Sequence, residues 1–142
     1  MTPSDRFPSA PVIDAIAWVR VREGRVLNVR AHGKDAFYLP GGKREPGETD
    51  AQTLVREVAE ELAVRLDPET IALFTVIDEA AHGYPAGTRV RLACYTAEAA
   101  GDPVPSAEIA ELAWLGPDDA DRCAPAGVRV LAELTARGLL AA

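Results

Sequence analysis

The segment from Ala51 to Ala63 most constrains how this chain can fold, because it has the pattern of a single amphipathic helix. At about 100° per residue, its apolar side chains share one broad side of a helical wheel. These are Ala51, Leu54, Val55, Val58, Ala59 and Leu62. Thr49 and Gln52 match a capping box at the start of the helix, and Asp67-Pro68 disfavours its continuation. The sequence therefore predicts a helix that begins at Thr49, runs to about Leu62 and packs by its apolar face.

The opposite side of this helix carries three like charges. Glu57, Glu60 and Glu61 fall within an arc of roughly 100°, and like-charged pairs at this spacing each destabilise a helix by a few tenths of a kcal/mol. A divalent cation bound among them would relieve the repulsion, and carboxylate oxygens suit Mg²⁺ or Mn²⁺. The alternative is a solvated acidic face. The preceding loop favours the metal site, because Gly41-Gly42 lets the backbone approach a ligand and Glu48 adds a fourth acid.

Strands and turns account for most of the remaining chain. The expected strands cover residues 12–21, 25–31, 36–40, 70–78, 89–97 and 108–116, although the last segment also fits a helix on pattern alone. A final helix is expected to begin at Pro125 and to stop near Gly138. We expect residues 12–142 to form one α+β domain, with a mixed sheet packed between helices, after a flexible N-terminal lead over residues 1–11.

Composition argues against several classes of protein. The net charge of −7 disfavours a general binder of nucleic-acid backbones. Apolar runs are too short for a membrane span, and the N-terminus lacks the apolar centre of a signal peptide. Cys94 and Cys123 form no CxxC motif, so we interpret them as reduced core thiols of a cytoplasmic protein.

Basic residues gather in one segment of this acidic chain. Seven lie between Arg20 and Arg44, against two acidic residues. They belong either to a phosphate-binding surface or to a solvated hairpin. The candidates for phosphate contact are Arg20, Arg30, Lys43 and Arg44.

Three aromatic residues are candidates to stack on a base, with core packing as the alternative: Phe37, Tyr38 and Trp18. His32 and His82 lie in predicted turns and are interpreted as ordinary surface histidines.

The acidic helix and its preceding loop resemble the box of the Nudix hydrolases, G-x5-E-x7-R-E-U-x-E-E-x-G-U, in which U is a bulky aliphatic residue. Gly42 and Glu48 occupy the first two defined positions, and the run from Arg56 to Val64 supplies the rest. Such a match at six charged or glycine positions is far more specific than an isolated motif. The resemblance covers roughly residues 12–137. It implies an α/β/α sandwich, a Mg²⁺ or Mn²⁺ cofactor and a small-molecule nucleotide substrate, and it is compatible with a homodimer.

The resemblance also implies roles for individual residues. Glu57, Glu60 and Glu61 are expected to bind the metal, with Glu57 as a candidate general base and Gly42 turning a backbone carbonyl toward the ion. Glu48 is expected to be a supporting acid and Arg56 its orienting partner. Many members recruit one more carboxylate from a later loop. The candidates, in order of preference, are Glu108, Glu98 and Glu79.

One position departs from the box, where Ala63 replaces the expected glycine. Glycine at such a position commonly takes the left-handed conformation that closes a helix, which costs alanine about 1 kcal/mol or more. We therefore expect a slightly different exit from the helix and an intact metal site.

The implied reaction is hydrolysis of a nucleoside diphosphate linked to a further group. The short chain is most similar to the nucleoside-triphosphate pyrophosphohydrolases, which release a nucleoside monophosphate and pyrophosphate. The alternatives are hydrolysis of ADP-ribose or dinucleoside polyphosphates, and a silent nucleotide-binding module. Ala124-Pro125-Ala126-Gly127 offers no amide where some relatives read the base, so specificity for oxidised guanine is not predicted.

Overall fold

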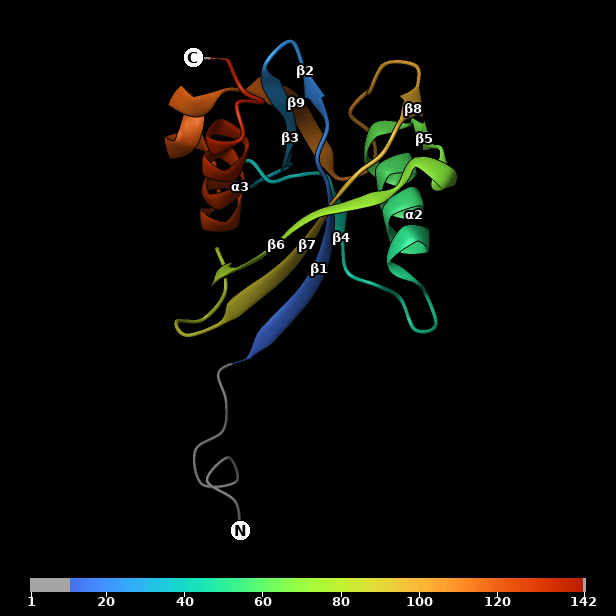
Figure 1. The fold of residues 1–142 in the computed structure, drawn as a ribbon. Coiled ribbons are helices and arrows are strands. Elements are labelled where there is room, and N and C mark those ends of the chain that lie inside the picture. Colours follow the sequence, from blue (N-terminus) through green and yellow to red (C-terminus); the bar gives the residue numbers. More distant parts are fainter. Residues whose placement is uncertain (1–10, 142) are drawn as a thin grey trace.

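Two helices pack on opposite faces of a mixed β-sheet in the computed structural model, which describes residues 11–141 (Figure 1). The sheet contains β1 (Val12–Trp18), β4 (Gly41–Gly42), β6 (Ala72–Ala80) and β7 (Arg89–Thr96), in the order β4-β1-β7-β6. β1 and β7 run parallel, and the other pairs are antiparallel. Helix α2 (Asp50–Leu62) lies on one face and α3 (Pro125–Ala136) on the other. The predicted α+β sandwich is confirmed.

β1 explains why both faces of the sheet are covered. Ile16 and Trp18 join a core cluster with Leu54, Val58 and Leu62 of α2. Ala17 and Val19, pointing the other way, join a second cluster with Val130, Leu131 and Leu134 of α3. Because successive side chains of a strand alternate between faces, a continuous apolar run requires a partner on each side.

A second sheet lies beside the first. It contains β2 (Val21–Arg22), β3 (Arg25–Ala31) and β9 (Ile109–Leu115), all antiparallel. The segment that also fitted a helix is thus a strand. Two shorter strands, β5 (Arg65–Leu66) and β8 (Ala99–Ala100), pair with each other. Two short 3₁₀ helices, η1 (Pro68–Thr70) and η2 (Pro117–Arg122), complete the order.

The strand predicted over residues 36–40 is wrong. Tyr38 exchanges backbone hydrogen bonds with Val29 of β3. Two residues later, the Pro40 carbonyl accepts a hydrogen bond from the Trp18 N–H of β1. The segment therefore crosses from one sheet to the other, making only isolated bridges, and pairing resumes at β4. The strand predicted over residues 12–21 is likewise interrupted after Trp18 and resumes as β2.

Cys94 and Cys123 are free thiols.

The ends of α2 test two local predictions. The capping box is confirmed, because the Gln52 N–H donates to Thr49 Oγ1 at 3.2 Å and the Thr49 N–H donates to Gln52 Oε1 at 2.9 Å. The expected change of helix exit is wrong: Ala63 itself takes the left-handed conformation, with φ 56° and ψ 29°. Leu62 and Val64 on either side are buried, so packing holds alanine in the conformation that glycine adopts more easily.

The predicted N-terminal lead, residues 1–11, lies outside the described residues except for Pro11.

Candidate metal and catalytic site

Three carboxylates from two distant parts of the chain meet at the edge of α2. Glu57 and Glu61 lie one turn apart on the helix, where residues four apart share a face. Glu108 immediately precedes β9. One oxygen from each lies within 4.8 Å of the others. We call this group the acid cluster.

Backbone hydrogen bonds bring Glu108 to the helix. The Ser106 N–H donates to the carbonyl of Glu61 at 2.9 Å, and the Glu108 carbonyl accepts from the His32 N–H at 2.8 Å. Between them Ala107 takes a left-handed φ of 52°. The loop is therefore fixed at both ends, and its strained residue directly precedes the carboxylate that it delivers.

Glu61 is the buried member of the cluster, with 3% of its surface exposed. Burial, and next a hydrogen bond and charge repulsion from Glu57, raise the pKa of Glu61 well above the usual range of a glutamate. The Gly41 N–H opposes this shift by donating to Glu61 Oε1 at 3.4 Å. A buried carboxylate among other carboxylates and one donor is suited to a cation, because hard oxygen ligands would then have a partner.

Gly41 and Gly42 are needed for steric reasons. A Cβ on Gly42 would lie 2.6 Å from Cδ of Glu57, and a Cβ on Gly41, whose φ is 149°, would lie 1.9 Å from the carbonyl oxygen of Ile16. Gly42, the first glycine of the box, therefore leaves room for the Glu57 carboxylate. Gly41 lets β4 pair with β1.

Arg56 links the loop before α2 to the acid cluster. Its Nε and Nη2 donate to the two carboxylate oxygens of Glu48, at 2.7 and 2.8 Å, and its Nη1 donates to Glu57 Oε1 at 2.8 Å. Glu48 also accepts from Thr53 Oγ1 and from the Glu45 N–H. Hydrogen bonding to Arg56 lowers the pKa of Glu48 to about 2. The structure thus places Glu48 on Arg56 and outside the acid cluster.

Glu60 also lies outside the cluster. Its side chain is 53% exposed, and its nearest ion-pair partner is Arg56 at 3.7 Å. It lies on the solvent side of α2, about one turn from Glu57. Its role as a metal ligand stays a prediction.

The two other loop candidates point elsewhere. Glu98 accepts from Arg20 at 3.2 Å, and Glu79 pairs with Arg129 at 3.4 Å. Among the three candidates for an additional carboxylate, Glu108 is the one that the structure brings to the helix.

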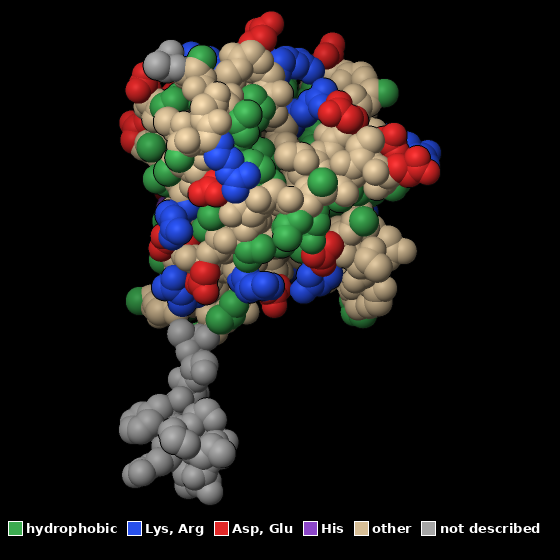
Figure 2. All heavy atoms as spheres, in the orientation of Figure 1, with side chains coloured by type: hydrophobic (Ala, Val, Ile, Leu, Met, Phe, Trp, Pro, Cys, Tyr) green, Lys and Arg blue, Asp and Glu red, His purple; other side chains and the backbone are tan. Residues whose placement is uncertain are grey.

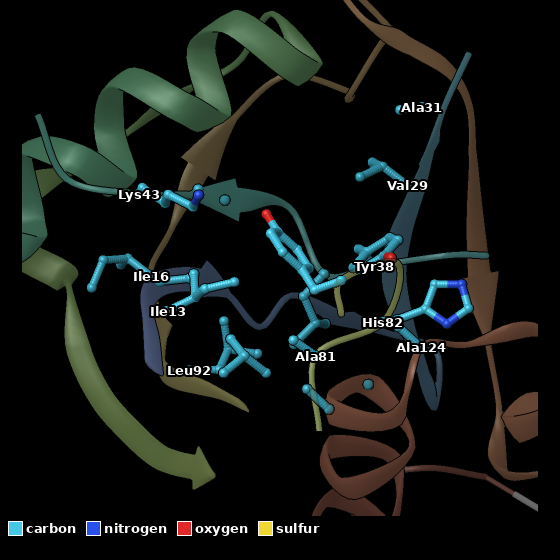
Figure 3. A pocket seen from close by; sticks show the side chains of 18 of the residues that line it. Ile13, Ile16, Val29, Ala31, Tyr38, Lys43, Ala81, His82, Leu92 and Ala124 are labelled. Atoms are coloured by element: carbon cyan, nitrogen blue, oxygen red, sulfur yellow. The ribbon is translucent and has the colours of Figure 1, made fainter. Parts of the chain in front are cut away.

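A cavity of about 290 Å³ adjoins the acid cluster. Glu61, Glu108, Gly42 and Lys43 contribute to its wall. In Figure 3, Lys43 lies on the same side of the cavity as Ile13 and Ile16 of β1 and Leu92 of β7, and His82 lies on the opposite side. The chemistry-bearing residues are therefore continuous with a pocket able to hold an organic group.

Only some of the predicted substrate contacts lie at this cavity. Lys43 and Tyr38 line it. The other three basic candidates are paired away from it: Arg20 with Glu98, Arg30 with Glu111 at 2.7 Å, and Arg44 with Asp50 at 2.6 Å. Phe37 and Trp18 are buried in the fold, and the Trp18 indole donates to the carbonyl of Ala97.

The sequence did not identify two residues of this cavity: His82, which we interpreted as an ordinary surface histidine, and Tyr84. Both line the cavity, from the loop between β6 and β7. His82 Nε2 lies 3.1 Å from Asp35 Oδ1, and Lys43 Nζ lies 5.7 Å from the centre of the Tyr84 ring. Two ring side chains in one turn-rich segment, residues 82–87, were a signal of a binding loop. Their position, however, depends on contacts with residues 35–43 that no local pattern reveals.

Comparison with known proteins agrees with this geometry. The NUDIX domain model matches residues 10–136. The chain belongs to the Nudix family. Members of this family hydrolyse phosphoric anhydride bonds in nucleoside diphosphate derivatives. Nudix hydrolases generally use a divalent metal, and the acid cluster is compatible with one.

Individual relatives match different parts of the Nudix domain. A MutT-like protein of Streptomyces ambofaciens is 33% identical over 108 residues, covering 74% of this chain and 64% of the relative. The human 8-oxo-dGDP phosphatase NUDT18 is 47% identical over 38 residues, covering 27% of this chain and 12% of the relative. The matches thus span less than two thirds of either relative.

A solved structure supports the fold over most of the chain. The MutT NUDIX hydrolase of Burkholderia pseudomallei is 26% identical with a TM-score of 0.69, covering 86% of this chain and 96% of that protein.

One face of the Nudix domain has mixed charge. Over the face drawn in Figure 2, acidic and basic side chains are interspersed. None of the helices within residues 11–141 is long and apolar enough to cross a membrane.

Proposed function

We propose that this Nudix hydrolase is a Mg²⁺-dependent or Mn²⁺-dependent pyrophosphohydrolase of nucleoside triphosphates, ribo- or deoxyribo-. The observation that carries the proposal is the acid cluster, Glu57, Glu61 and Glu108, at the end of a cavity for an organic group. The cluster would hold the cation together with Glu60, whose exposed side chain lies one turn from Glu57. A cation held there would supply positive charge to the phosphate oxygens and would make the attacking water more acidic.

The chain's own residues account for the remaining steps. A water attacks phosphorus, its proton passes to a carboxylate, and the products are a nucleoside monophosphate and pyrophosphate. We assign Glu57 as the carboxylate that accepts this proton, because Arg56 donates a hydrogen bond to one of its oxygens at 2.8 Å and so orients it. Arg56 is held in turn by its hydrogen bonds to Glu48 and to the Lys43 carbonyl. Lys43, in the cavity wall beside Gly42, is the candidate to contact the substrate phosphates.

The comparisons support the substrate class at a general level. One relative is named as a phosphatase of a nucleoside diphosphate and another as MutT-like, each matched over part of its length. The cavity volume of about 290 Å³ is at the small end of ligand pockets, which favours one nucleoside over two joined by a polyphosphate. We extend the proposal to a cytoplasmic enzyme, because Cys94 and Cys123 form no disulfide, and leave the homodimer as a prediction of the family resemblance.

The proposal is tested by offering nucleoside triphosphates, ADP-ribose, nucleotide sugars and dinucleoside polyphosphates with Mg²⁺ or Mn²⁺, and by identifying the products. We expect triphosphates to be cleaved fastest, with release of pyrophosphate. Glu57→Gln, Glu60→Gln and Glu61→Gln should each lower turnover without unfolding the protein. Faster cleavage of ADP-ribose or dinucleoside polyphosphates would overturn the proposed triphosphate substrate. Nucleotide binding without cleavage of any compound would favour the silent nucleotide-binding module.

A further inference from the structure

Three rings surround the outer part of the cavity. Tyr38 follows the turn after β3, and His82 and Tyr84 come from the loop between β6 and β7. The Tyr38 and His82 ring centres lie 6.2 Å apart, tilted by 58°. Tyr38 is 38% exposed and Tyr84 is 49% exposed, so both rings retain free surface beside the cavity. Exposed rings at the entrance to a pocket are suited to stacking on a planar ligand.

The ring-bearing loop is held in place on more than one side. The Ala81 N–H donates to the Thr88 carbonyl at 2.9 Å, and His82 Nε2 lies 3.1 Å from the carboxylate of Asp35. Tyr84 lies under the ammonium group of Lys43, which follows the box glycine. The rings are therefore positioned against the part of the site where phosphates are expected.

The inner part of the cavity is apolar. β1, β7 and the start of α3 contribute most of it, through side chains such as Ala15, Leu92 and Ala126. Among the described residues that line the cavity, none is Asn, Gln, Ser or Thr. Its polar side chains are Glu61 and Glu108 of the acid cluster, Lys43, and the three rings. Few side chains are thus placed to form hydrogen bonds with the edge of a base.

We propose that this cavity recognises a nucleobase by stacking and apolar contact, with Tyr84 and His82 as the stacking residues, so that the enzyme discriminates little among bases. The inference rests on the proposed function. Its physical basis is an asymmetry: a site that forms hydrogen bonds to its ligand rejects an analogue lacking them by about 10⁴–10⁵-fold, whereas an apolar pocket separates similar ligands only about 10–200-fold.

The first test is the ratio of kcat/KM among dATP, dCTP, dGTP, dTTP and 8-oxo-dGTP, measured with the same metal. We expect the five values to lie within about 200-fold of one another. A preference above about a thousandfold for one base would overturn the inference while leaving the hydrolase proposal intact. Cleavage of none of the five would instead overturn the proposed function.

The second test separates stacking from hydrogen bonding by the Tyr84 hydroxyl. Tyr84→Ala should raise KM for all the triphosphates by a similar factor, about 5- to 150-fold, with kcat less affected. Tyr84→Phe should retain the wild-type KM, because it keeps the ring. An equal loss in Tyr84→Phe, or a loss confined to one base, would overturn the inference.

Histidine offers a matched control. His82→Ala should raise KM for every base in the same way. His32→Ala should leave KM unchanged, because the His32 side chain is exposed, does not line the cavity, and meets Glu108 only through its backbone N–H. Equal effects of the two substitutions would contradict a role for His82 in binding.

Discussion

Glu61 is 3% exposed and has an oxygen within 4.8 Å of oxygens from two other carboxylates, with a single N–H donor, on Gly41, at 3.4 Å. In the metal-free protein this arrangement opposes ionisation, because burial and a neighbouring charge both favour the neutral acid. The residue therefore carries a cost in stability that a bound cation would offset.

The unfavourable ionisation of buried Glu61 predicts how the stability of the metal-free protein depends on pH. The pKa of Glu61 is raised in the folded protein, so its contribution to stability is complete below the ordinary glutamate pKa of about 4.3 and is lost as the pH rises toward the folded value. Glu61→Gln should remove this loss. We expect the variant to be about 1–3 kcal/mol more stable than wild type at pH 8, and closer to it at pH 5, in urea unfolding with EDTA.

Turnover of Glu61→Gln should fall sharply in the same preparation. A variant that is less stable than wild type at pH 8, or that keeps its activity, would show that Glu61 is not the strained acid of the site.

Ala63 gives a second prediction for a single residue. Its left-handed conformation, with φ 56°, costs alanine roughly 1–2 kcal/mol and costs glycine little. Ala63→Gly should therefore stabilise the protein by about 0.5–1 kcal/mol after allowing for the greater freedom of glycine in the unfolded chain. Urea unfolding measures the change.

The matched control is Ala59→Gly, at an exposed position inside α2, which should destabilise the protein by about 1 kcal/mol. Equal destabilisation by the two substitutions would contradict the conformational explanation.

Among the elements, α2 was the most predictable, because its signals are local. The capping residues Thr49 and Gln52, the apolar stripe and the carboxylates all act within a few turns. Segment 36–40 was mispredicted because its composition suits a strand while its partners change from β3 to β1 within three residues. The loop bearing His82 could not be placed, because its contacts with Asp35 and Lys43 join residues about 40 or more positions apart.

The pairing of β4 with β1 and its contact with α2 predict different results for two adjacent glycines. In Gly42→Ala the new Cβ would meet the flexible end of Glu57, which must move. We expect kcat to fall about 100-fold, as displacement of a catalytic group by about 1 Å can cost, with little change in the urea midpoint.

In Gly41→Ala the new Cβ would meet the backbone carbonyl of Ile16 at 1.9 Å, and the φ of 149° disfavours any side chain. We expect this variant to lose about 2 kcal/mol or more of stability. Similar stability losses in the two variants would contradict the separate roles assigned to the glycines.

At the scale of the whole molecule, the sheet joins the core cluster beneath α2 to the core cluster beneath α3. α2 packs on one core cluster and α3 on the other, and β1 contributes alternate residues to both. The box predicted Glu57 and Glu61 from one stretch of sequence. Glu108 lies 47 residues beyond Glu61 in the chain and could only be ranked among candidates, since its position depends on how β9 pairs with β3 and how its loop binds the end of α2.

The central claim is that Glu108 completes a cation site with Glu57 and Glu61. The most direct measurement compares Glu108→Gln with Glu98→Gln, a matched change at the exposed acid that pairs with Arg20. The Mg²⁺ concentration that half-activates hydrolysis should rise about tenfold or more in Glu108→Gln and stay at the wild-type value in Glu98→Gln. An unchanged Mg²⁺ requirement in Glu108→Gln, or a larger change in Glu98→Gln, would contradict the claim.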